Sequence, residues 1–159
     1  MKLKETVQTW LVGSINDPIV KIIAKDSNLT TTQLETLLID ILSDNIASKP
    51  LKYEEKARLR LTKAQISRGA FNRTLRQAKE NVIRSIYTVL LLGYLGIFES
   101  TTLDPYLEIA NKLHAYLEAF KDLPNKGGTL NEQQRVIETI REELETSLKQ
   151  LSNPSKSTT

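Results

Sequence analysis

Apolar residues recur at steps of three and four along almost the whole chain, and this spacing constrains the fold more than any other feature. It is clearest after Thr30, where six aliphatic residues follow one another at helical intervals: Leu34, Leu37, Leu38, Ile41, Leu42 and Ile46. Such intervals place side chains on one face of an α-helix. The alternation typical of a strand occurs only over residues 58–61, which is too short. The sequence therefore predicts an all-α protein with about six helices.

Helix start signals divide these segments. Thr30 and Gln33 have the spacing of a capping box, in which each side chain accepts a hydrogen bond from the other residue's backbone N–H. Asp17-Pro18 and Asp104-Pro105 each predict an N-cap followed by proline at the first helical position. Ser67 has the residue type of a further N-cap. Each signal predicts a helix that begins at the following residue.

The predicted helices group into two parts and a tail. We expect a helical domain over residues 1–98, whose central helix-turn-helix-like unit covers about 30–95, and a C-terminal helical hairpin over 99–151. Residues 152–159 are polar and are predicted to be disordered. The segment 86–95 is apolar on every side, so it predicts a buried central helix, with Tyr87 and Tyr94 burying ring area. Trp10 is expected to anchor the first helix in the core.

Positive charge is concentrated in residues 51–84. This basic block holds ten Lys or Arg and three acidic residues, a local charge of +7, whereas the whole chain carries +3. The remainder of the chain is therefore slightly acidic. A concentrated basic block is the electrostatic footprint of a surface that holds phosphates.

Within the basic block lies the run ISRGAFNRTLRQA, residues 66–78. It resembles the recognition-helix region of helix-turn-helix DNA-binding proteins in general. The resemblance covers about thirty residues. In those proteins a small hydroxyl residue often opens the helix, polar and basic residues face the groove, and aliphatic residues anchor the back. It implies a helix that enters the major groove. Gly69 departs from the pattern, since a glycine is commoner in the turn before the helix.

A helix beginning at Ser67 has two distinct faces. Phe71, Leu75, Ala78 and Val82 form an apolar back within about 60° of one another, at 100° per residue. The opposite face carries Arg73, Arg76 and Gln77, which could bond base edges, since Arg pairs with guanine and Gln with adenine. Phosphate contacts are expected from Arg58, Arg60, Lys63, Arg68, Asn72, Lys79 and Arg84. The alternative is one long helix over 51–92 whose charges are simply solvated.

Catalysis has no visible basis in the sequence. His114 is the single histidine and has no second ligand at metal spacing, and the chain contains no cysteine. Lys126-Gly127-Gly128 is too short for a phosphate loop. We expect no enzyme activity, no metal and no cofactor. The lack of cysteine fits a reducing compartment, so we expect a cytoplasmic protein, nucleoid-associated in a prokaryote.

The sequence thus predicts a non-catalytic protein that binds duplex DNA, as a transcriptional regulator or a chromosome-associated protein. A homodimer through the C-terminal helix would present two recognition helices. No membrane contact is expected, because the longest apolar run, 85–98, is shorter than the roughly 20 residues that a spanning helix needs. Two alternatives remain open: an RNA-binding helical protein, and an adaptor whose basic face binds an acidic protein.

Overall fold

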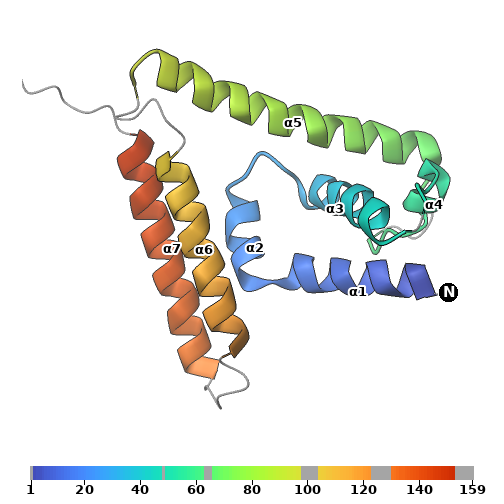
Figure 1. Ribbon diagram of the computed structural model, residues 1–159, viewed down its shortest axis with the longest axis horizontal. Coiled ribbons are helices and arrows are strands. Elements are labelled where there is room, and N and C mark those ends of the chain that lie inside the picture. The colour runs from blue at the N-terminus through green and yellow to red at the C-terminus, as the bar shows by residue number, and fades with distance from the viewer. Residues whose placement is uncertain (1, 48, 63–65, 98–103, 123–129, 153–159) are drawn as a thin grey trace, which may run out of the picture. The chain divides into compact units, whose positions relative to one another are not determined.

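The computed structural model of the protein describes residues 2–47, 49–62, 66–97, 104–122 and 130–152 (Figure 1). These residues form helices and contain no strand, which confirms the all-α prediction. The helices are α1 (Lys2–Asn16), α2 (Pro18–Lys25), α3 (Thr31–Ile46), α4 (Tyr53–Ala57), α5 (Arg68–Tyr94), α6 (Asp104–Asp122) and α7 (Leu130–Ser152). Seven described helices agree with the expected number of about six.

The chain forms two compact units, Met1–Ile86 and Tyr87–Thr159. The division falls inside α5, about three turns earlier than the boundary at residue 98 suggested by the sequence. The predicted disordered tail, 152–159, lies outside the described residues except for Ser152.

The core of the first unit joins α1, α3, α4 and the beginning of α5. Its fully buried side chains include Val7 and Leu11 of α1, Ile39 of α3 and Phe71 of α5. Each such side chain contributes about 1.5–3 kcal/mol by leaving water. Helix α1 packs along α3, and α2 leaves the end of α1 in a new direction (Figure 1). The core therefore holds the first turns of α5 in a defined orientation.

Three of the four predicted helix starts are confirmed by their hydrogen bonds, while α6 begins at Asp104 itself, one residue before the predicted start. Thr30 and Gln33 form the complete capping box at α3, with Thr30 N 3.0 Å from Gln33 Oε1 and Gln33 N 3.2 Å from Thr30 Oγ1. Asp17 Oδ1 accepts from the N–H groups of Ile19 and Val20 at the start of α2. At α5, Ser67 Oγ accepts from the backbone N–H of Ala70 at 3.1 Å. These signals are local, so the sequence alone could place them.

The buried face of α3 differs from the expected one. Its most buried residues are mainly polar, namely Glu35, Thr36, Ile39, Asp40 and Ser43. Ile41, expected in the apolar face, is 50% exposed, although four of its predicted neighbours pack partly buried against the core. The face has rotated because the two carboxylates have cationic partners inside the unit, which offset the cost of their burial.

In the second unit, α6 and α7 run antiparallel as a hairpin, as the sequence predicted (Figure 1). Ile140 of α7 is buried, and the hydroxyl of Tyr116 on α6 donates a hydrogen bond to Glu143 of α7. Helix α7 thus packs against a neighbouring helix of the same chain.

The apolar segment 86–95 is exposed in the structure, so its expected burial is wrong. Ile86, Leu90 and Leu91 are each more than half exposed, and Tyr94 is 89% exposed. Helix α5 has 27 residues and is about 40 Å long, while its buried side chains end at Ala78. The core of the first unit covers only the beginning of so long a helix. Trp10, expected in the core, is also exposed. Across the described part of the chain, no helix combines the length and apolarity needed to span a membrane.

Candidate nucleic-acid interface

The first three turns of α5 are docked by the apolar back that the sequence predicted. Phe71, Leu75 and Ala78 are the buried residues of this helix, and Val82 marks the end of the covered stripe at 37% exposed. The Phe71 ring lies against Tyr53 of α4, with ring centroids 6.5 Å apart. The alternative of one continuous helix over 51–92 is excluded, since α4 ends at Ala57 and α5 begins at Arg68.

The opposite face of α5 carries the predicted base-facing residues. Arg73, Arg76 and Gln77 are exposed, and Arg68 is exposed in the first turn. Within the described residues, the side chains of Arg73 and Arg76 form neither an ion pair nor a hydrogen bond. The guanidinium groups are therefore open to a partner in solution.

The predicted phosphate-binding residues separate into several environments. Arg58, at the C-cap of α4, and Arg84, on α5, are exposed. Asn72 is half-buried, and its Oδ1 atom is buried without a hydrogen-bond partner among the described residues, so it is poorly placed to meet a phosphate. Lys63 lies outside the described residues.

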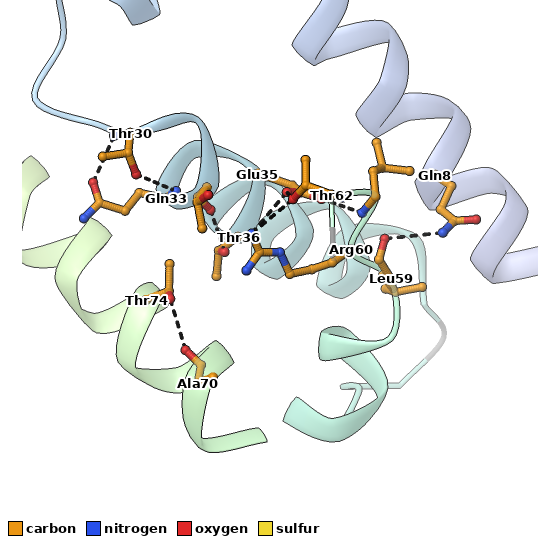
Figure 2. Close-up of polar contacts among 12 residues, drawn as sticks. Gln8, Thr30, Gln33, Glu35, Thr36, Leu59, Arg60, Thr62, Ala70 and Thr74 are labelled. Carbon is orange, nitrogen blue, oxygen red and sulfur yellow. Dashed lines mark hydrogen bonds and ion pairs between the residues drawn. The ribbon is translucent and has the colours of Figure 1, made fainter. Parts of the chain in front are cut away.

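Arg60 is not on the surface, which corrects its predicted role in holding backbone phosphates. The residue is 5% exposed and its guanidinium lies against α3, on the side toward Thr74 of α5 (Figure 2). Nη2 of Arg60 lies 3.3 Å from Oε2 of Glu35 and 3.3 Å from the hydroxyl oxygen of Thr62. A stiff duplex backbone cannot reach a guanidinium in this position.

Glu35 is the acceptor around which the segment 60–62 folds. Its carboxylate accepts from the backbone N–H of Leu61 at 2.5 Å and of Thr62 at 3.3 Å, and from the Thr62 hydroxyl at 2.5 Å (Figure 2). Burial alone would raise the pKa of Glu35. The hydrogen bonds from Thr62 and Leu61 and the charge of Arg60 outweigh it, so the pKa of Glu35 lies below its ordinary value. Glu35 is therefore ionised at neutral pH.

A second ionic cluster joins α3, α4 and α5. Lys56 Nζ lies 2.8 Å from Asp40 Oδ1 and 2.8 Å from Asp44 Oδ1, and Lys79 Nζ lies 2.8 Å from Asp40 Oδ2. Lys56 is buried, whereas the side chain of Lys79 is 52% exposed. Burial would raise the pKa of Asp40, but the hydrogen bonds and charges of the two lysines bring that pKa below its ordinary value. Lys79, predicted to bind phosphate, is thus already paired.

Sequence reasoning missed that part of the basic block faces inward. A signal was present: α3 contains three acidic residues, Glu35, Asp40 and Asp44, and no basic residue. Two of these acids lie among the aliphatic residues of a helix predicted to bury one face. Ionised carboxylates in such positions require cationic partners. The excess of cations in the segment that follows α3 supplies them.

Comparison with protein families, curated proteins and solved structures finds no match for this chain. Among the described residues, no group of His, Cys, Asp and Glu side chains could hold a metal ion. The function of this protein is therefore inferred from the arrangement of its own residues.

Proposed function

We propose that this protein binds duplex DNA without catalysis, as a transcriptional regulator or a chromosome-associated protein. One observation carries the proposal: the first turns of α5 bury Phe71, Leu75 and Ala78 while Arg73, Arg76 and Gln77 stay exposed on the other side. A helix fixed by its apolar back, with an Arg and Gln front, has the side chains that major-groove recognition uses.

The roles within the interface follow from exposure. Arg73, Arg76 and Gln77 contact base edges, because they share the exposed face of the docked part of α5. The cations that flank this face contact phosphates, and they are Arg58, Arg68, Arg84 and Lys79. Lys79 keeps its pair with Asp40 and, because its side chain is 52% exposed, donates to the phosphate from the remaining N–H groups of its ammonium. Arg60 has no part in the interface because it is buried.

A salt titration on the full chain tests the proposal. Affinity for a labelled duplex is measured by fluorescence anisotropy between about 50 and 200 mM salt, and log K is expected to fall with log salt at a slope near −0.9 per phosphate contacted. A flat salt dependence, or equal affinity for every polyanion, contradicts a specific DNA-binding protein.

Paired variants separate recognition from charge. Arg73→Ala with Arg76→Ala is expected to remove preference among duplex sequences and leave residual non-specific binding, because base contacts carry the specificity. The matched control is Lys21→Ala with Lys25→Ala, which removes two exposed positive charges from α2. The control is expected to keep the sequence preference. Loss of preference in both pairs would point to charge alone.

Competitors address the remaining alternatives. Duplex RNA that displaces DNA at lower concentration favours an RNA-binding protein, which would use the same cations on phosphates and shape. Displacement by polyglutamate at lower concentration favours an adaptor for an acidic protein. The proposal includes a homodimer through the α6–α7 hairpin, where Leu148 of α7 stays 44% exposed. Sedimentation velocity of the full chain tests it, and a monomer at micromolar concentration contradicts it.

A further inference from the structure

A pocket of about 370 Å³ opens in the first unit, on the side of α3 that faces the beginning of α5. Its lining is rich in hydroxyl groups and consists of Thr32, Arg60, Thr62, Ile66, Ala70 and Thr74. Figure 2 shows the Arg60 guanidinium on the side of α3 toward Thr74. The volume falls within the range of small-molecule sites. The interface described above does not use this pocket.

Arg60 is incompletely bonded although its side chain is 96% buried, at 4% exposed. Its hydrogen bonds within the described residues both come from Nη2. Nε is buried and has no partner there. Guanidinium groups offer five N–H donors in a fixed fork, and buried donors are normally satisfied. The Nη1 group forms no hydrogen bond within the described residues, so Arg60 keeps unused donors beside the pocket that it lines.

Glu35 satisfies only part of this guanidinium. Its carboxylate receives its two shortest hydrogen bonds, both 2.5 Å, from the Leu61 N–H and the Thr62 hydroxyl. The contact to Arg60 is longer, at 3.3 Å, and uses a single nitrogen. Because other donors stabilise the carboxylate, Arg60 can turn its fork toward a second acceptor and keep its contact with Glu35.

Two further hydroxyl groups can donate into the same pocket. Within the described residues, the Thr32 hydroxyl forms no hydrogen bond. The Thr74 hydroxyl donates to the carbonyl of Ala70 at 3.1 Å, an oxygen that also accepts the helical N–H bond, so it can rotate away at little cost. Ala70 lies in the first turn of α5, where the helix dipole favours negative charge.

We propose that this pocket binds a small soluble ligand through one oxyanion group, a carboxylate or a phosphate, held by Arg60, Thr32 and Thr74. An oxyanion accepts the several hydrogen bonds that these donors offer, and guanidinium recognises it by its planar fork. The ligand is small because Arg60 is only 5% exposed, and a phosphate within a duplex backbone cannot approach so buried a guanidinium. This site is separate from the proposed DNA interface and does not depend on it.

Calorimetric titration of the full chain with inorganic phosphate and, separately, with acetate tests the site, with chloride at matched ionic strength as the blank. Saturable binding of either anion is expected. Thr74→Val keeps the shape of the side chain and is expected to weaken binding about tenfold or more, since it removes a hydrogen bond to a charged group. Thr139→Val is the matched control, because Thr139 is also a helical threonine that donates to the carbonyl four residues earlier. It is expected to leave binding unchanged.

Arg60→Lys keeps the charge and removes the fork, so it is also expected to weaken binding, with circular dichroism confirming that the variant folds. If Arg60→Lys unfolds, Thr32→Val replaces it as the second pocket variant. The proposal is overturned if neither anion binds saturably, or if Thr74→Val binds as tightly as Thr139→Val.

Two further arms separate the ligand source and the two proposals. Arg73→Ala with Arg76→Ala is expected to keep its anion affinity whether or not it binds DNA. Loss of anion binding in that variant would overturn the separate site. Duplex DNA is expected not to displace the small anion, and displacement would assign the pocket to backbone phosphates.

Discussion

Two sets of cations in one basic block lie in opposite environments. Lys56 and Arg60 are buried against carboxylates of α3, whereas Arg58, Arg73 and Arg76 from the same block are exposed. The two sets are interleaved at Lys56, Arg58 and Arg60, and both contain arginine. Their difference shows that a count of charges in a segment does not measure the charge that the segment presents to a partner.

Lys56 and Arg60, the inward set, face α3 because of where this helix carries its acids; Arg58, Arg73 and Arg76 are the outward set. Glu35 and Asp40 lie on the side of α3 that meets the segment 56–62 and α5. Once these carboxylates leave water, each needs a charged or hydrogen-bonding partner, and a cation without a partner would be strongly destabilising in the same place. The outward set has no such partners on α3 and remains solvated.

The largest effect is expected from removing an inward partner. Glu35→Ala should lower the free energy of unfolding by about 3–5 kcal/mol, because it leaves the charge of Arg60 buried without its carboxylate. Urea unfolding followed by circular dichroism measures it. The control is Arg73→Ala, an exposed residue, which should change stability by less than about 0.5 kcal/mol. Equal effects of the two variants would remove the distinction between the sets.

Acid should unfold the protein by protonating the carboxylates that hold the inward cations. The pKa values of Glu35 and Asp40 lie below the ordinary values of 4.5 and 3.8, so the unfolded chain takes up these protons first as the pH falls. Their stabilisation is complete above the ordinary values and is lost as the pH drops through the folded values. Urea midpoints between pH 7 and 3 measure this loss. Glu35→Gln should give a shallower acid slope, and a slope identical to the wild type would contradict the assignment.

At the opposite end of the pH range, Lys56 should act with the reverse sign. Burial would lower the pKa of Lys56, but its hydrogen bonds to Asp40 and Asp44 raise it above the ordinary value of 10.5. Its stabilisation is therefore present at neutral pH and is lost as the pH rises through the folded value.

The exposed arginines of α5, Arg73 and Arg76, depend for their position on where this helix begins. Ser67→Ala removes the hydroxyl that caps the Ala70 N–H and should cost about 1 kcal/mol. Hydrogen exchange of amides in the first turn of α5 should accelerate, while Ser67→Asp, which restores a capping acceptor, should keep the wild-type rate. Unchanged exchange in Ser67→Ala would show that the cap does not set this end of the helix.

Lys79 belongs to both sets and should show the smallest effect on stability. It pairs with Asp40 but its side chain is 52% exposed, so Lys79→Ala should cost only about 0.2–1 kcal/mol. Lys56→Ala, at the buried end of the same carboxylate, should cost more in the same urea experiment. If the two lysine variants cost the same, exposure does not separate the sets.

Much of the helical framework was predictable because its signals are local. The capping box at Thr30, the Asp17-Pro18 start and the Ser67 cap each act within one helical turn, and each is present in the structure. The apolar back of α5, at Phe71, Leu75 and Ala78, was predictable for the same reason.

Predictions failed where they needed to know what covers a surface. The segment 86–95 has the composition of a buried helix, yet most of its side chains are exposed because α5 extends beyond the core that holds its first turns. The predicted buried face of α3 was wrong because apolar spacing takes no account of the acids in the same helix, and two of these acids are buried. Arg60 was assigned to phosphate for the related reason that only its charge was counted.

The sequence by itself determined that this chain is helical, where its helices start and which side of the beginning of α5 is apolar. Only the tertiary structure decided which cations of the basic block face a partner and which face α3. The physical reason is distance along the chain. A cap or an apolar stripe involves residues within a few positions of each other, whereas Glu35 and Arg60 are 25 residues apart. Their pairing follows from the desolvation that packing imposes, and packing is settled only when the helices meet.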